Sequence, residues 1–201
     1  MPVTAAFAHL RRLLESARGS VAAETAMALP VLLLIFYGAV ELGRFILAYQ
    51  KASLVAAQAA DLIARLDDPV TESDIADIFA AIDEIAAPFD IVNEGRVIVS
   101  LLVGDSVDGN VIVWQRCAGT LAAGSQLGSA GATNVELPAG ITLANNDTVV
   151  VAEVYFDYAP LFGDNGVTTA RRLYERAVYR PRFGALTAIA DDGTPPASCG
   201  G

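Results

Sequence analysis

Residues 18–49 read RGSVAAETAMALPVLLLIFYGAVELGRFILAY, and this stretch decides the fold of the chain. After a lone Glu24, no charged residue occurs from Thr25 to Val40. A helix from Thr25 to Arg44, rising ~1.5 Å per residue, would extend about 30 Å, which is the thickness of bilayer hydrocarbon. Leu, Val, Ala, Ile and Phe dominate the stretch. It therefore predicts one membrane-spanning helix.

Basic residues on either side of this helix predict its orientation. Arg11, Arg12 and Arg18 precede the apolar run in a short N-terminal segment, which favours keeping that end in the cytoplasm. Arg44 and Lys51 follow the run and weaken the bias. We expect everything after Lys51 to be exported.

A cleaved secretory signal is the alternative interpretation of the apolar run. Glu41 and Arg44 follow the run at once, and no small-x-small cleavage site lies near its end. The sequence Ala57-Gln58-Ala59 comes only after further charges. We therefore favour a retained anchor.

Glu24 is the most informative residue, because a carboxylate beside an apolar helix is costly to insert unless it is paired or protonated. It stands five residues after Gly19, behind a short basic leader. This arrangement resembles the type IV prepilin processing pattern, in which a membrane aspartyl protease cuts after the glycine. Three further segments make the chain resemble the TadE-like pseudopilins, minor components of tight-adherence pili: Ala28-Leu29-Pro30, Glu41-Leu42-Gly43-Arg44 and Tyr179-Arg180-Pro181-Arg182.

The resemblance implies processing and assembly. A prepilin peptidase would cut between Gly19 and Ser20, and Glu24 would then neutralise the N-terminal amine of a neighbouring subunit. The implied partners are other pilin or pseudopilin subunits, an inner-membrane assembly platform and the membrane. Thr25 departs from the usual pattern, which has an aromatic residue there. The alternative for Glu24 is an interfacial carboxylate at the start of an ordinary anchor, favoured by the helix dipole.

Glu41 and Arg44 form a second candidate assembly site. They are three residues apart and would share a helix face near the outer boundary of the membrane. They can pair within one helix or between two subunits, and the sequence leaves both open.

Composition limits the function of the exported part. The formal charge is −10, and it becomes −12 if residues 1–19, with their three Arg and one Glu, are removed. An acidic domain argues against nucleic-acid binding. The only histidine, His9, lies in the leader, so the processed chain would lack the commonest general base and zinc ligand. We therefore expect no enzyme, no metal and no cofactor.

Two helices are predicted first in the exported part. The anchor helix should continue as an amphipathic segment over 52–66, buried through Val55, Leu62, Ile63 and Leu66, and end at Asp67-Asp68-Pro69. Thr71 should cap a second helix with Glu72 and Asp74 in its first turn. Pro88 should close that helix, whose core face recurs at helical spacing: Ile75, Ile78, Phe79, Ile82, Ile85, Ala86 and Phe89.

Strands follow. Runs 97–103 and 111–117 predict a hairpin around a turn at 105–110, with Trp114 partly buried. Residues 118–147 have the composition of a surface loop, with a subunit contact as an option. The run 148–158 predicts a strand whose Glu153 and Asp157 lie opposite its apolar face.

The last predicted strand, 172–180, has Leu173, Ala177 and Tyr179 inward. Its other face carries Arg172, Arg176 and Arg180, which pair with acidic groups such as Glu153 and Asp157 or meet an acidic partner.

The C-terminal tail is polar and contains Cys199, and Cys117 is the only other cysteine. Two cysteines suit an oxidising compartment. The resemblance to pilins, which often staple their C-terminal part, implies a Cys117–Cys199 disulfide, with an intermolecular bond as the alternative. Asp191 and Asp192 are expected to be solvated.

The chain is thus expected to have an α+β, pilin-like fold: a leader (1–19), a transmembrane helix (20–50), an exported domain with a second helix and about four antiparallel strands (51–190), and a tail (191–201). The expected protein is a minor pilin or pseudopilin of the inner membrane, with a cytoplasmic N-terminus, a periplasmic domain and assembly into a surface pilus. The alternative is a single-pass anchored binding or sensing module that does not polymerise.

Overall fold

The computed structural model describes residues 17–138, 141–161, 163 and 168–199. The chain forms two compact units, Met1–Arg44 and Phe45–Gly201. Helix α2 (Ala17–Ile63) contributes residues to both units and runs through Pro30 without interruption. Most of the predicted leader, residues 1–16 with His9, lies outside the described residues.

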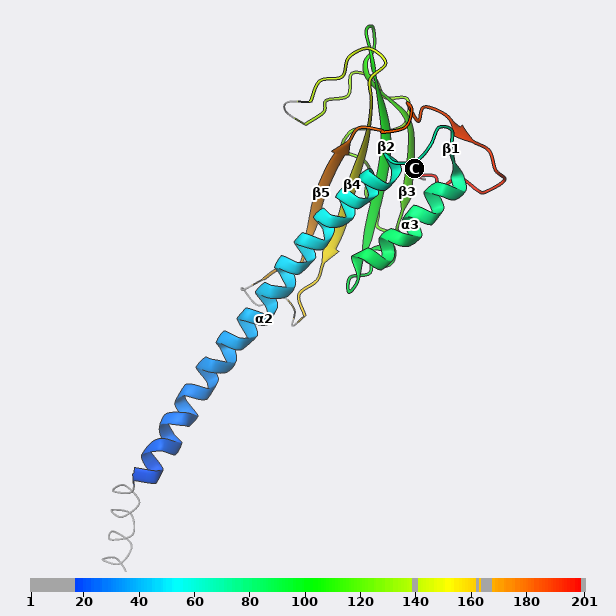
Figure 1. The fold of residues 1–201 in the computed structure, drawn as a ribbon. Helices are drawn as coiled ribbons and strands as arrows, with labels where there is room; N and C mark the ends of the chain where they lie inside the picture. The colour runs from blue at the N-terminus through cyan, green and yellow to red at the C-terminus, as the bar shows by residue number, and fades with distance from the viewer. Residues whose placement is uncertain (1–16, 139–140, 162, 164–167, 200–201) are drawn as a thin grey trace, which may run out of the picture. The chain divides into compact units, whose positions relative to one another are not determined.

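The second unit combines two helices with an antiparallel sheet of four strands in the order β3-β2-β4-β5 (Figure 1). The predicted α+β class, with a long apolar N-terminal helix, a second helix and four antiparallel strands, is confirmed. The elements after α2 are β1 (Val70–Thr71), α3 (Glu72–Ala86), α4 (Ile91–Glu94), β2 (Gly95–Asp105), β3 (Gly109–Ala118), β4 (Thr148–Tyr158), β5 (Arg171–Tyr179) and β6 (Ile189–Ala190).

Helix α2 ends earlier than the sequence predicts. It stops at Ile63, and the backbone then tightens into a turn in which the N–H of Leu66 donates to the carbonyl of Ile63. The carbonyl of Ala64 accepts a hydrogen bond from the backbone of Arg182, 2.8 Å away. A partner far along the sequence thus satisfies the helix end, and no local stop signal was needed.

The start of α3 is the one that the sequence predicts. The hydroxyl of Thr71 accepts from the backbone of Asp74, and the Asp74 carboxylate accepts from the backbone of Thr71. This capping box satisfies two donors at the helix start.

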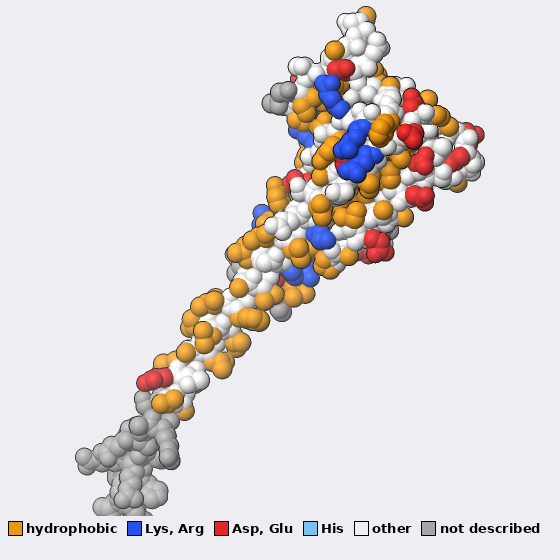
Figure 2. All heavy atoms as spheres, in the orientation of Figure 1, with side chains coloured by type: hydrophobic (Ala, Val, Ile, Leu, Met, Phe, Trp, Pro, Cys, Tyr) orange, Lys and Arg blue, Asp and Glu red, His pale blue; other side chains and the backbone are white. Residues whose placement is uncertain are grey.

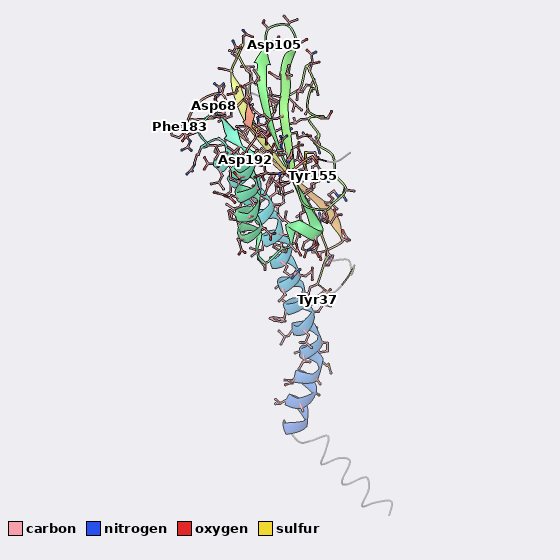
Figure 3. The ribbon with its side chains drawn as sticks, turned by 90° about the vertical axis from the view of Figure 1, so that its right-hand side faces the viewer. Tyr37, Asp68, Asp105, Tyr155, Phe183 and Asp192 are labelled. Carbon is pink, nitrogen blue, oxygen red and sulfur yellow. A yellow bond between two sulfur atoms is a disulfide. The ribbon has the colours of Figure 1, made fainter. Side chains whose placement is uncertain are left out.

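The predicted hairpin joins β2 to β3. Asp105, at the tip in Figure 3, accepts hydrogen bonds from the backbone of Val107 and Asp108. These two bonds lower the pKa of the Asp105 carboxyl. Gly109 follows with φ +67, a conformation that costs glycine least. A short parallel pairing of β1 with β6 was not predicted.

The main core lies between the helices and one face of the sheet. Alternate β4 residues face it, from Val150 to Tyr158, as predicted. Trp114 was predicted to be partly buried, but it is only 6% exposed and its indole N–H donates to the carbonyl of Leu186 at 2.8 Å. The face that α2 presents to this core consists mainly of alanines: Ala48, Ala52, Ala56, Ala59 and Ala60.

The connection 118–147 covers part of the other face of the sheet, so its prediction as a surface loop was incomplete. Leu127 and Val135 are buried there against Ile112, Val149 and Val151. At its end the connection meets β2 closely at Gly104, where an added Cβ would lie 2.3 Å from the carbonyl oxygen of Ala144. Both faces of the sheet therefore contribute to cores.

Strand β5 departs from prediction at one residue. Leu173 is buried and Ala177 packs on the main core, as expected. Tyr179 was predicted to point inward, but it is 37% exposed because it lies at the last position of an edge strand.

Candidate functional site

The N-terminal part of α2 is apolar in every direction. Six consecutive residues, 31–36, are all large apolar residues and all exposed. Because successive residues of a helix point about 100° apart, six of them cover its whole circumference. Among the described residues, α2 is the one helix long and apolar enough to cross a membrane.

The predicted processing residues lie at the start of this helix. Gly19 and Ser20 belong to the first turns of α2, which begins at Ala17. Glu24 follows about one turn later and is exposed, with apolar residues around it on the helix. The predicted spacing of Gly19 and Glu24 thus falls within one continuous helical segment.

Thr25 satisfies its own hydroxyl within the helix. Its Oγ1 donates to the carbonyl oxygen of Val21 at 2.8 Å. A hydroxyl bonded four residues back does not need water, so Thr25 is compatible with an apolar surrounding.

Glu41 and Arg44 lie near the end of the first unit. Both belong to α2, three residues apart, and so share one helix face as predicted. Whether they bind each other or a neighbouring subunit stays a prediction.

The second part of α2 is held to the domain by polar contacts from distant segments. Lys51 Nζ donates to the carbonyl of Ile85 at 2.8 Å, at the C-terminal end of α3. Asp61, only 6% exposed, accepts from Arg182 at 2.9 Å and also pairs with Arg65. The Arg-Pro-Arg segment after β5 thus reaches the end of the same helix that begins with the processing residues.

Residues 19–61 match the TadE-like protein family. The matched residues include Gly19, Glu24, the apolar run and Asp61. Neither the curated proteins nor the solved structures contain a significant match to the chain. The resemblance to TadE-like pseudopilins is thereby confirmed for residues 19–61, which we call the TadE-like segment.

The match indicates a protein associated with tight-adherence pili. The TadE-like family consists of pilus components and is not a family of enzymes. Together with the apolar helix, it indicates a single-pass membrane anchor with membrane and pilus partners.

Beyond the TadE-like segment, Cys117 and Cys199 are bonded to each other. The sequence left an intermolecular bond open as the alternative. The backbone around the disulfide is also bonded: Cys117 donates to the carbonyl of Ala197 at 2.8 Å, and Arg96 Nη2 donates to the carbonyl of Cys199 at 2.6 Å. The tail therefore lies against β2 and β3.

Asp192 is not merely solvated, as the sequence suggested. It lies beside the start of α3 (Figure 3), where its carboxylate accepts from the backbone N–H of Ser73 at 3.0 Å and from the Ser73 hydroxyl. These hydrogen bonds and that from Thr194 lower the pKa of the Asp192 carboxyl well below its usual range.

Glu153 is fully buried, and the sequence did not predict this. Its carboxylate accepts from the hydroxyl of Ser125, from the backbone of Gln126 at 2.9 Å and from the Tyr174 hydroxyl at 2.9 Å. Burial and the neighbouring Glu153 charge raise the pKa of the Tyr174 phenol. Glu153 thereby holds the connection 118–147 to the sheet.

A second internal ion pair joins α3 to β3. Glu72 is only 7% exposed and binds Arg116, whose Nε lies 3.0 and 2.9 Å from the two carboxylate oxygens. The predicted pair of Arg172 with Asp157 is present at 2.7 Å and lowers the pKa of the Asp157 carboxyl. Glu153, by contrast, accepts its hydrogen bonds from Ser125, Gln126 and Tyr174.

The chemistry that remains is limited. Within 17–138, 141–161, 163 and 168–199, no three His, Cys, Asp or Glu residues are placed to hold a metal ion. A hollow of about 860 Å³ lies between the sheet, the connection 118–147 and the tail, beside the disulfide. Arg96, Gln115 and Ser129 contribute to its walls.

Proposed function

We propose that the protein is a minor pilin or pseudopilin of a tight-adherence pilus system. The single observation that carries the proposal is the TadE-like match over a helix that is apolar on all sides. In this proposal the leader is 1–19, the membrane helix 20–50, the exported domain 51–190 and the tail 191–201. The helix serves first as an inner-membrane anchor and then as the contact between subunits.

Processing is the first step. A prepilin peptidase cuts between Gly19 and Ser20 at the cytoplasmic face, which gives Ser20 a free amine. A side chain at Gly19 would obstruct a protease that requires glycine before the cut. The support for this step is the position of Gly19 at the start of the TadE-like segment.

The N-terminus of the purified protein tests this step. Mass spectrometry should find Ser20 as the first residue, and Gly19→Leu should leave the leader in place. Gly38→Leu is a matched control, since it makes the same change where an added Cβ meets nothing within 4 Å. A wild-type chain that retains Met1 or Pro2 would contradict the proposal.

Assembly is the second step, and Glu24 sets its register. A carboxylate among apolar side chains is stabilised by a nearby cation, and the Ser20 amine of a neighbouring subunit supplies one. Glu41 and Arg44 lie further along the same helix and provide a second pair, within one helix or between two.

Glu24→Ala should leave membrane insertion intact and reduce incorporation into pili. Glu24→Asp is the control, because it keeps the charge while shortening the side chain. Cell fractionation measures insertion, and sheared surface filaments measure incorporation. Normal incorporation of the alanine variant would refute the role of Glu24.

The second candidate function is an anchored binding module that does not polymerise. The hollow beside the disulfide favours it, since a cavity of this size can receive a small ligand. An intact N-terminus beginning at Met1 would support this candidate.

A further inference from the structure

Charges are segregated along the second unit. From Leu66 to Gly95 the chain has nine carboxylates and no Lys or Arg. From Arg171 to Arg182 it has five arginines and one carboxylate. The second unit, Phe45–Gly201, has nine Lys and Arg residues in all, so this short segment contains five of the nine.

The basic surface lies along strand β5, at one edge of the sheet. Arg172 and Arg176, four residues apart in β5, share the face opposite the helices, and Arg180 follows directly after the strand at the same spacing. We call these three residues the basic edge. Within the described part of the chain, β5 pairs with β4 on one side, and no backbone hydrogen bond joins β5 to a segment outside the sheet.

Part of this positive charge remains available. Arg172 pairs with Asp157 and Arg180 with Asp147, yet the two arginine side chains are 45% and 62% exposed. Arg176 is exposed, and no ion pair with it is found among the described residues. The pairs therefore leave the basic edge open to further anions.

The acidic surface lies at the C-terminal end of α3. Asp83 and Glu84 are exposed there, and with Asp90 they border a hollow of about 450 Å³. We call these three residues the acidic end. The helix dipole adds negative charge at this terminus, where Lys51 is bonded to the carbonyl of Ile85.

The two surfaces belong to opposite sides of the domain. The sheet ends with β5 at one edge and β3 at the other. Helix α3 packs on the face of the sheet that carries the main core, whereas Arg172 and Arg176 alternate with Leu173 and Ala177 and so lie on the other face. Figure 1 shows α3 on the side of β3, away from β5, and Figure 2 shows acidic side chains gathered on the side of α3. One copy therefore cannot bring its own two surfaces together.

We propose that the basic edge of one copy binds the acidic end of a second copy. The inference rests on the proposed function for its setting, a membrane in which several copies meet. The two surfaces differ, so the contact is head-to-tail and can repeat along a filament. Two basic edges repel each other, as do two acidic ends, which disfavours a two-fold dimer through either surface.

Reversing the charge of each surface in turn tests the proposal. The full chain is used in detergent, because detergent covers the apolar helix. In one variant Arg176→Glu and Arg180→Glu reverse the basic edge. In the other, Asp83→Lys and Glu84→Lys reverse the acidic end. Sedimentation velocity at low ionic strength should show concentration-dependent association of the wild type, weakened about tenfold or more in each variant alone. An equal mixture of the two variants should associate again, because each then offers the surface that the other lacks.

Two controls separate a specific contact from a general effect of charge. Asp108→Lys with Glu136→Lys changes the net charge as much as the acidic-end variant does, at exposed positions away from α3, and should associate like the wild type. Salt of about 1 M, where the Debye length is about 3 Å, should weaken the wild-type association. A wild type that stays monomeric, a mixture that stays dissociated, or a control that loses association equally would overturn the proposal.

These results are independent of leader processing. A Ser20 N-terminus without charge-dependent association refutes the head-to-tail contact and leaves the pilin function standing. Charge-dependent association of a chain that retains Met1 supports the contact and refutes the pilin function.

Discussion

The two parts of α2 use the same secondary structure in opposite ways. From residue 21 to residue 36 the helix is exposed on all sides, with large apolar residues such as Leu33 and Phe36, and Glu41 is the first fully buried residue after it. From Ala48 onward one face is fully buried, and it is built mainly from alanines. The first part has the properties of a helix surrounded by lipid or by other helices, whereas the second has those of a core helix.

Side-chain size explains the difference. Alanines at positions 48, 52, 56 and 60 recur every four residues and form a smooth ridge that lets the helix backbone approach its neighbours. The first part has no such constraint, because large apolar side chains fit equally well against fluid lipid. The two parts should therefore respond differently to the same substitutions.

Removal of the disulfide should have the largest effect, and only on the domain. Cys117 and Cys199 are 82 residues apart, and opening a loop of this length costs about 4 kcal/mol by chain entropy. The double substitution to serine should lower the free energy of unfolding of the domain by that amount, which lowers its urea midpoint. Membrane insertion should be unchanged. Fluorescence of the single, buried Trp114 reports unfolding.

Treatment of the wild type with a reductant is the control for this prediction and should reproduce the loss. A change below about 1 kcal/mol would mean that the tail is held by its other contacts, those of Arg96 and Asp192.

The second prediction applies one substitution to both parts of the helix. Ala60→Leu inserts three carbons into a fully buried position and should destabilise the domain by about 1–3 kcal/mol. Ala39→Leu makes the same change where the side chain is exposed and should leave the unfolding midpoint unaltered. The measurement is urea unfolding of both variants in detergent. Equal effects at the two positions would abolish the distinction between the two parts.

The sequence contained most of the local structure. The apolar run, the capping box at Thr71, the hairpin turn at Asp105 and the alternation along β4 depend on neighbouring residues, and all four were predicted. The start of α2 was not predicted, because the helix begins at Ala17, inside the segment expected to be a leader.

The contacts between distant segments could not be predicted. The partner of Lys51 lies 34 residues away, and one partner of Asp61 lies 121 residues away. Glu153 was expected opposite the apolar face of its strand, paired with an arginine, but the connection 118–147 covers it and bonds it through Ser125 and Gln126. Nothing in the composition of that connection indicates this. Charged residues that are buried by folding cannot be told from solvated ones by local pattern alone.

The third prediction concerns the contact that ends the core part of α2. Arg182→Ala removes the ion pair with Asp61 and should cost about 0.5–1 kcal/mol, since the arginine is 51% exposed and solvent screens the pair. Arg180→Ala is a matched control, because its pair with Asp147 is longer, at 3.3 Å, and more exposed. Thermal unfolding should give a lower melting temperature for Arg182→Ala than for Arg180→Ala. The reverse order would show that Asp61 is satisfied by Arg65 alone.

The smallest expected effect lies at the start of α3, and it depends on pH. Asp192 has a lowered pKa because its charged form accepts hydrogen bonds from Ser73 and Thr194. A carboxyl whose folded pKa lies below its unfolded value, about 3.9, stabilises the fold above that pH and loses this contribution as the pH falls further. Asp192→Asn should therefore be less stable than the wild type near neutral pH, and the difference should shrink below about pH 4.

Urea unfolding at several pH values measures this difference, and Asp191→Asn is the adjacent control. Asp191 accepts only from the backbone of Gly193, two residues on, so its replacement removes no contact with α3. The domain as a whole should also weaken in acid, because Asp105 and Asp157 have lowered pKa values too. An Asp192→Asn variant as stable as the wild type at every pH would show that the amide replaces the carboxylate at the helix start. The tail would then stabilise α3 through hydrogen bonds that do not require a charge on residue 192.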